Sequence, residues 1–515
     1  MNRPKDNPPP RRNAGVFVRT PAAVVEDCPR PDPIGTTVAV MTIAIALLTL
    51  KGDYPSAVAA YAAKLTLSAL ILSFLFDLKK GLSNLIRADV MAMLAFYFLT
   101  LFEFLFPQNL FDTMARPTSA MFATQIVLAA FIGMLIGRHF IHPKVQPFQK
   151  VLTYEIPAGF LVGLFWVAFC VGYMHQWTAP KVNWDFVKWI DYSMAARFEQ
   201  PWGRGRLGDF GALIYELNML INLVPPLAGI ILARRQRFGG VSLLLIVLAY
   251  LLTLFLAFCG GTRNVLATFL VTFVIGYAFA SPKGKKKELF VIGGAAAALL
   301  VFGTLTMIHI RTVGLKKYLA GELPHSVGKT DSLYVDYNLY NISKLTEVFP
   351  KRLPYLGLEV AYLAAIRPVP RVLWPGKPEG LSSTIEDALG YKQGNITISA
   401  SFAGEAYISG GVFAVMLFGM FFGAINGWWS HLASPRNSEL GILIYASGFF
   451  AAVISMRSLF TYTTALLPTV AAIVGGTYLV RYLAEKARVL GFRGGNRARQ
   501  VMRTARPGLP PPRRP

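Results

Sequence analysis

The apolar residues of the chain occur in long continuous blocks, not at the three- and four-residue spacing of an amphipathic surface helix. A helix needs roughly 20 apolar residues to cross about 30 Å of hydrocarbon, and an open strand cannot satisfy its backbone in lipid. The pattern therefore predicts an all-α polytopic membrane protein with about twelve transmembrane helices. The predicted spans are residues 34–50, 55–76, 90–106, 119–137, 151–173, 211–233, 240–259, 264–281, 289–308, 411–430, 439–456 and 459–480.

Positive residues gather in alternate connections between these blocks. Cytoplasmic loops carry an excess of Lys and Arg, so this distribution predicts that both termini are cytoplasmic. The same rule predicts that the two long connections, residues 174–209 and 309–401, are on the outer face. The connections assigned to the inside hold Lys79, Lys80, Arg87, Arg138, Lys144, Lys150, Arg234, Arg235, Arg237, Lys283, Lys285, Lys286 and Lys287.

The blocks and connections divide the chain into five parts. They are a basic Pro-rich tail (1–33), nine spans (34–308), a large outer loop (309–401), three spans (411–480) and a second basic tail (481–515). The first residues of that second tail, 481–491, can extend the last helix by a few turns. Long loops on one face of a bundle commonly carry function, so the two outer loops are the places to look for it.

The composition narrows the possible partners. Of the 515 residues, 54% are hydrophobic and 15% are charged, and the net charge is +24. Most of that charge is in the inside loops and tails, which favours membrane topology and anionic lipid headgroups over nucleic acid. The three cysteines have no metal-ligand spacing, and the outer loops contain no HExxH or DxD motif. We therefore expect no metal and no cofactor.

A proline-rich strip, Arg367-Pro-Val-Pro-Arg-Val-Leu-Trp-Pro-Gly-Lys377, lies in the second outer loop. Its prolines favour a stiff, non-helical backbone that displays Arg367, Arg371 and Lys377 beside Trp374. Arginine forks and a lysine ammonium suit a diphosphate, whereas snorkelling at the membrane interface is the ordinary alternative. The apolar segment before the strip, 353–366, is too short to span and predicts an interfacial or re-entrant helix.

Other arginines occur at the outer ends of spans. Arg263 follows Gly260-Gly261-Thr262 at the start of the eighth span, where a helix N-terminus favours an anion; a plain hairpin is the alternative. Arg457 has the same relation to the last span. The first outer loop holds Arg197, Arg204 and Arg206 around Trp202. This composition is typical of contacts with sugars or lipid phosphates, and it is equally common at membrane interfaces.

The segment Ser401-Phe-Ala-Gly-Glu405-Ala-Tyr407 directly precedes the tenth span. Glu405 can accept a proton from an acceptor hydroxyl or can orient a nearby arginine. His309 and His325, near the start of the loop, are further candidate bases because imidazole titrates near neutral pH.

Taken together, these residues resemble the Wzy-type O-antigen and exopolysaccharide polymerases, also called oligosaccharide repeat unit polymerases. The resemblance covers about residues 240–480 and depends on Gly261-Thr-Arg263-Asn, Pro370-Arg371-Val-Leu-Trp374-Pro-Gly-Lys377-Pro and Gly404-Glu405-Ala-Tyr407. That family has an Arg-x10-Gly pattern in its outer loops. Arg197 with Gly208 fits the spacing, whereas the second loop does not.

The resemblance implies a metal-independent glycosyltransferase of the C type at the periplasmic face of a bacterial inner (plasma) membrane. Its substrate would be an undecaprenyl-diphosphate-linked oligosaccharide, and a chain-length regulator and a flippase would be its partners beside membrane lipids. Arg263, Arg371 and Glu405 would be catalytic. The substrate-binding residues would be Arg197, Arg204, Arg367, Trp374, Lys377, Tyr407 and Arg457.

Two other functions remain open at this point. An O-antigen ligase shares the fold and the donor but uses an outer-loop histidine, for which His325 is the candidate. A lipid-linked oligosaccharide flippase or transporter also needs many helices, although such proteins tend to show internal repeats and polar residues at the membrane midplane.

Overall fold

A computed structural model gives the structure of the protein, and its regular elements are helices throughout the described residues. The described residues are 30–81, 84, 86–141, 149–197, 199–202, 217–281, 286–321, 337–369, 373–378, 380–390, 399–433 and 437–504.

Eight helical segments in the described part of the chain are long and apolar enough to cross a membrane, and four more apolar segments are shorter. The protein is therefore an all-helical chain with the features of a polytopic membrane protein. Each of the twelve predicted blocks overlaps one of these segments, and the number that cross the bilayer stays a prediction. The long segments belong to α2 (Pro55–Leu78), α5 (Pro117–Gly137), α7 (Ala158–Trp177), α11 (Gly240–Cys259), α12 (Arg263–Ala280), α13 (Lys286–Val313), α18 (Ser401–Ser430) and α20–α21 (Leu459–Ala465, Leu467–Thr504). The shorter segments are α1 (Pro33–Leu48), α3 (Ala88–Thr100), η4–α10 (Leu217–Leu223, Val224–Ala233) and α19 (Glu439–Ile454).

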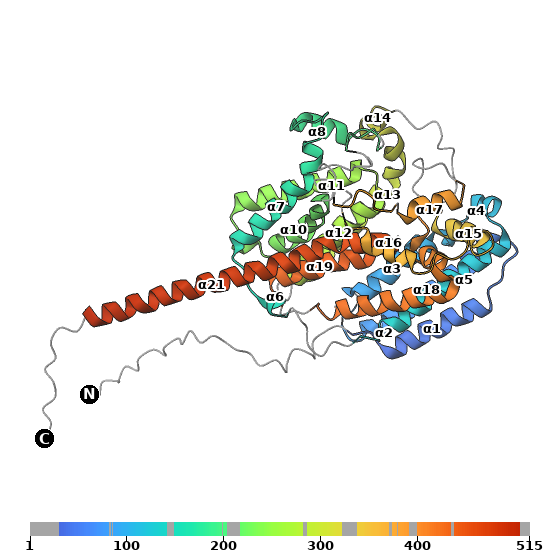
Figure 1. Ribbon diagram of the computed structural model, residues 1–515, viewed down its shortest axis with the longest axis horizontal. Helices are drawn as coiled ribbons and strands as arrows, with labels where there is room; N and C mark the ends of the chain where they lie inside the picture. The colour runs from blue at the N-terminus through green and yellow to red at the C-terminus, as the bar shows by residue number, and fades with distance from the viewer. Residues whose placement is uncertain are drawn as a thin grey trace, which may run out of the picture.

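Short helices occupy the connections. Figure 1 shows α4, α8, α14 and α17 along the upper and right-hand margin, while α21 leaves the bundle toward the left. At about 1.5 Å per residue, the 38 residues of α21 extend roughly 57 Å. The helix thus continues through the predicted extension at 481–491 and beyond it. The short elements are η3 (Phe102–Leu105), α4 (Asn109–Met114), α6 (Gln149–Thr153), α8 (Phe186–Ser193), η5 (Arg235–Arg237), α14 (Leu315–Leu319), α15 (Asn338–Val348), α16 (Glu359–Ile366) and α17 (Leu381–Ala388).

Glycines allow α5 and α18 to pack with their backbones in contact. A Cβ atom built on Gly137 would lie 2.1 Å from the carbonyl oxygen of Met420, and one on Gly423 would lie 2.2 Å from that of Met134. Gly419, Gly423 and Gly427 recur every four residues and so share one face of α18. Small residues at such spacing are the usual means by which membrane helices approach closely.

One end of the bundle, which we call the basic end, holds a buried ion cluster. The Arg87 guanidinium lies 2.5 Å from the Asp89 carboxylate and 3.3 Å from that of Asp77, and Arg138 lies 3.3 Å from Asp77. All four side chains are 2% exposed or less. Ser430 of α18 donates a 2.9 Å hydrogen bond to Asp89, so the cluster joins α2, α3, α5 and α18.

The same end includes the turn after α10. Arg234 donates to the Ala280 carbonyl at the end of α12 (2.9 Å) and pairs with Glu439 at the start of α19 (3.5 Å). Because the end of one helix meets the start of the other, α12 and α19 run antiparallel. The starts of α12 and α20 and the ends of α13 and α19 consequently lie at the opposite end, which we call the loop end.

The two long connections meet at the loop end. The Lys316 ammonium of α14 lies 2.7 Å from the Asp191 carboxylate of α8, and the Lys316 amide donates to the Met194 carbonyl (3.4 Å). Asp185 caps the start of α8 by accepting from Val187 and Lys188 amides (2.9 and 3.1 Å), and these bonds lower the pKa of its carboxyl. Helix α13 reaches Val313, so the predicted loop boundary at residue 309 falls inside a helix.

Candidate functional site

A chain of hydrogen bonds, which we call the polar hub, links three elements at the loop end. The Ser399 hydroxyl has two acceptors for its one proton, the Asn338 side-chain oxygen at 2.7 Å and the Arg457 carbonyl at 3.2 Å. Asn341 in turn donates to the Ser399 carbonyl (2.8 Å). The hub thereby fixes the Arg457 backbone, between α19 and α20, against α15 and the start of α18.

Glu405 completes the hub by capping α20. Its two carboxylate oxygens accept from the Ser458 hydroxyl (2.6 Å) and from the Leu459 amide (2.5 Å). The amides of a first helical turn lack partners within the helix, and a carboxylate satisfies one here. Glu405 is 6% exposed. Of the two predicted roles, this geometry favours orientation of an arginine, because Glu405 fixes the residues that directly follow Arg457.

Two residues beside the hub have strained backbones. Tyr337, before α15, has φ +52°, and Ser401, at the start of α18, has φ +55°. A non-glycine residue in this left-handed region costs about 1–3 kcal/mol and persists only where its surroundings hold it. The hydrogen bonds of Asn338, which follows Tyr337, and of Ser399, two residues before Ser401, provide such surroundings.

Helix α18 breaks at Gly410–Gly411, which divides a first segment carrying Glu405 from the long apolar segment. Gly411 has φ +69°, and a Cβ there would lie 3.0 Å from the Tyr355 hydroxyl. Tyr407, in the first segment, is 1% exposed and donates to the Phe349 carbonyl (2.9 Å). Tyr407 is therefore a buried packing residue. Its low exposure does not support the predicted contact with substrate.

The described part of the proline-rich strip is non-helical, as predicted, but it folds back on itself. The Lys377 ammonium donates to the carbonyls of Arg367 and Val369 (2.7 and 2.9 Å). Arg367 and Trp374 are half-buried beside this turn. Lys377 thus stabilises the end of α16, and the expectation of an extended strip that displays all its cations does not describe this part of the loop.

A helix, α16, forms within the segment predicted to be interfacial or re-entrant, over a shorter range than 353–366, and its position relative to the membrane stays a prediction. Thr463 of α20 donates to the Ala364 carbonyl (2.5 Å), which holds α16 against α20. Leu358 and Tyr362 face outward, at 86% and 48% exposure. These exposed apolar side chains suit contact with hydrocarbon, and α16, at eight residues, is too short to span a membrane.

A second group, the arginine cluster, consists of Arg197, Arg263 and Arg311. The Arg197 amide donates to the Arg311 carbonyl (3.4 Å). A Cβ on Gly261, in the turn before Arg263, would lie 3.1 Å from the Arg311 Cβ, and Gly261 has φ +61°. The connection that follows α8, the end of α13 and the start of α12 therefore meet at one place.

Arg311 was not among the predicted site residues. The sequence feature that could have pointed to Arg311 is its position two residues after His309, as a charged residue near the end of an apolar block that ends in Val313-Gly314. Its nearness to Arg197 arises from a contact between residues far apart in the sequence, which spacing alone does not reveal. Arg311 is exposed, and Arg197 and Arg263 are half-buried.

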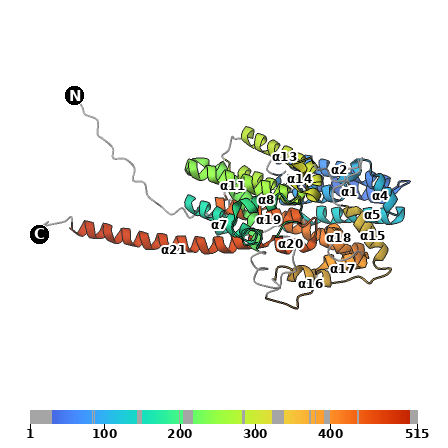
Figure 2. The same ribbon diagram turned by 90° about the horizontal axis from the view of Figure 1, so that it is seen from above.

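The helices next to the two cationic regions lie on opposite sides of α19 and α20. Figure 2 shows α19 and α20 between α13 on one side and α16 with α17 on the other. Arg457, at the turn from α19 to α20, and the arginine cluster both lie at the loop end, and Thr463 of α20 holds α16, the helix that precedes the strip. Arg204, Arg371, His325 and Gly208 lie outside the described residues.

Comparison with known proteins adds one match. A family model described as a domain of unknown function, DUF8712, matches residues 333–461. That region, about a quarter of the chain, contains α15, the proline-rich strip, Glu405 and Arg457. No curated protein and no solved structure matches the chain. The matched region therefore coincides with the hub and its surroundings but brings no activity with it.

Proposed function

We propose that the protein polymerises polyprenyl-diphosphate-linked oligosaccharide repeat units at the outer face of a bacterial inner membrane. The observation that carries this proposal is that Arg457, the arginine cluster and the start of the proline-rich strip all lie at the loop end, where α20 holds α16. A diphosphate is the anionic group that such a set of guanidinium groups suits, because each planar fork makes paired contacts with phosphate oxygens.

The proposed reaction is glycosyl transfer without a metal. The acceptor hydroxyl oxygen bonds to the anomeric carbon of the donor, the bond from that carbon to the diphosphate oxygen breaks, and the acceptor proton passes to a base. Negative charge develops on the departing polyprenyl diphosphate, and Arg263, Arg311 and Arg457 stabilise it. Confinement of both substrates to the bilayer raises their effective concentration.

Glu405 acts in this proposal as a positioning residue. Its hydrogen bonds to Ser458 and Leu459 hold the turn that presents Arg457. Lys377 has the same kind of role in the strip, since its ammonium binds two carbonyls. Arg371 remains a proposed diphosphate ligand on the basis of sequence alone.

The direct test is a glycan gel from a host in which the gene is deleted. Surface glycan that consists of single repeat units identifies a polymerase. Full-length polymer left on the polyprenyl carrier identifies a ligase instead, and repeat units trapped at the cytoplasmic face identify a flippase.

Variants then test the proposed site. Arg263→Ala, Arg311→Ala and Arg457→Ala should each shorten or abolish the polymer at wild-type protein level in the membrane. Arg352→Ala is the matched control, because Arg352 is an exposed arginine in the loop before α16. Wild-type polymer length in all three site variants would reject the proposed diphosphate contacts.

A further inference from the structure

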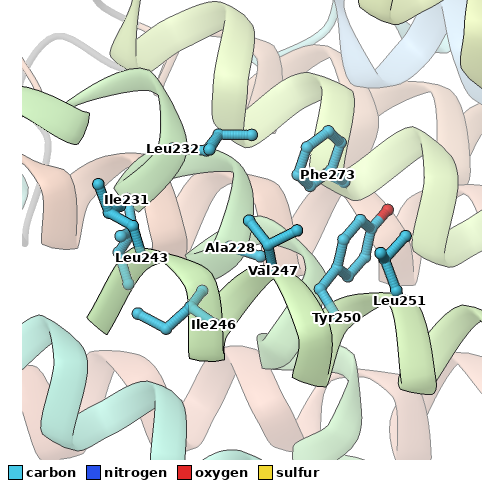
Figure 3. Close-up of a pocket in the computed structure, with 9 residues that line it drawn as sticks. All are labelled: Ala228, Ile231, Leu232, Leu243, Ile246, Val247, Tyr250, Leu251 and Phe273. Atoms are coloured by element: carbon cyan, nitrogen blue, oxygen red, sulfur yellow. The ribbon is translucent and has the colours of Figure 1, made fainter. Parts of the chain in front are cut away.

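An apolar groove opens between α10, α11 and α12 toward the basic end of the bundle. It encloses about 190 Å³ and is lined by apolar side chains together with the Tyr250 ring. Figure 3 shows Val247 of α11 facing Phe273 of α12 and Leu232 of α10. Pockets for drug-sized ligands enclose roughly 300–1,000 Å³, so this groove has room for part of one hydrocarbon chain.

The groove follows from unequal helix packing. α10 and α12 pack closely, because a Cβ on Gly229 would lie 2.3 Å from the Phe273 carbonyl and one on Gly276 would lie 2.5 Å from the Pro226 carbonyl. α11 contacts this pair through large side chains, and the Tyr250 ring stacks on Phe273 with 4.5 Å between centroids. The side chains hold α11 away from the pair and leave the space open.

The outward surface of α11 is apolar as well. Leu244, Leu248 and Leu251 are 59%, 52% and 52% exposed. Exposed leucines along a helix of this hydropathy are suited to hydrocarbon rather than water. The groove therefore opens onto a surface that lipid chains cover in a membrane.

Cations surround the groove where it meets the basic end. Leu232, which lines the groove, is two residues before Arg234, and Arg235 and Arg237 follow in η5. The three arginine side chains are 38%, 48% and 39% exposed. With exposed Lys287 they make four cations against the carboxylates of Glu288 and Glu439, so the described residues here carry a positive excess.

We propose that this groove binds an anionic phospholipid of the bilayer. One acyl chain lies between α10, α11 and α12, and the headgroup phosphate contacts Arg235 and Arg237. The partly exposed arginines retain donors for phosphate while they pair with Glu288 and Glu439. This site is independent of the proposed polymerase activity, because it lies at the end of the bundle opposite the polar hub.

Native mass spectrometry of the detergent-purified full chain tests this, with phosphatidylglycerol and phosphatidylcholine of identical acyl chains as probes. Wild type should retain phosphatidylglycerol at least tenfold more strongly. Val247→Trp fills the groove and should lower retention of both lipids, whereas Arg235→Gln with Arg237→Gln should remove the preference for phosphatidylglycerol and keep chain binding.

Leu248→Trp is the matched control, since it places the same side chain on the neighbouring, outward-facing position of α11. It should bind both lipids as wild type does. Equal retention of the two lipids by the wild type would overturn the proposal without any variant. Wild-type phosphatidylglycerol binding by Val247→Trp would also overturn it.

Discussion

Both carboxylate oxygens of Glu405 accept hydrogen bonds at the start of α20, so we expect substitutions of Glu405 to change the stability of the protein. Glu405→Ala leaves the buried Leu459 amide without its acceptor, which costs about 1–3 kcal/mol. We expect a lower Tm of the detergent-solubilised protein together with shorter polymer. Glu405→Gln keeps a side-chain oxygen for the amide and should retain most of both.

Ser458→Ala is the control for this change, because it removes only the hydroxyl bond to Glu405. Its Tm should lie between those of the wild type and Glu405→Ala. A Glu405→Gln protein with wild-type Tm and no polymer would contradict a positioning role and would assign the carboxylate to proton transfer instead.

The buried ion cluster makes a second prediction at the residue scale. Asp77 lies between Arg87 and Arg138 and also accepts from the Asp32 amide (2.7 Å). Asp77→Ala leaves two buried guanidinium groups facing one carboxylate, and removal of one partner of a buried pair costs about 3–5 kcal/mol. We expect a large loss of Tm, whereas exposed Asp53→Ala should change it little. Equal Tm values for the two variants would contradict a stabilising role of the cluster.

At the scale of elements, the contact between α5 and α18 depends on its glycines. Gly423→Ala places a Cβ 2.2 Å from the Met134 carbonyl oxygen, so the helices must separate, at a cost of about 1–3 kcal/mol. Gly163→Ala in α7 is the matched control, because a Cβ at Gly163 would have no neighbouring atom within 4 Å. Thermal unfolding followed by circular dichroism should give a lower Tm for Gly423→Ala and an unchanged or higher Tm for Gly163→Ala. The opposite order would show that the close approach does not stabilise the bundle.

The elements also show what sequence could predict. Apolar blocks predicted helices at the right places because hydrocarbon requires paired backbones. The break in α18 was not predicted; it falls at Gly410-Gly411, where Gly411 adopts φ +69° without strain. The contacts of the candidate functional site were predicted less well than the helices. The fold-back of Lys377 and the meeting of Arg197 with Arg311 depend on contacts between distant segments, and such contacts leave no local pattern.

At the scale of the whole molecule, the two ends of the bundle differ in their connections. The loop end carries both long connections, and the basic end carries the arginine-rich turn after α10 and the last turn of α2. By the excess of Lys and Arg in short cytoplasmic loops, the basic end should face the cytoplasm. The proposed function requires this orientation, because its substrate is consumed at the outer face.

Single cysteines can test that orientation directly. Lys79, after α2, and Lys317, in α14, are both exposed and lie at the basic and loop ends respectively. In a background that lacks Cys28, Cys170 and Cys259, a membrane-impermeant maleimide should label Lys317→Cys in intact spheroplasts. It should label Lys79→Cys only after permeabilisation. The reverse pattern would place the polar hub in the cytoplasm and exclude transfer at the outer face, whereas the predicted lipid preference would be unaffected, since the groove needs only a bilayer.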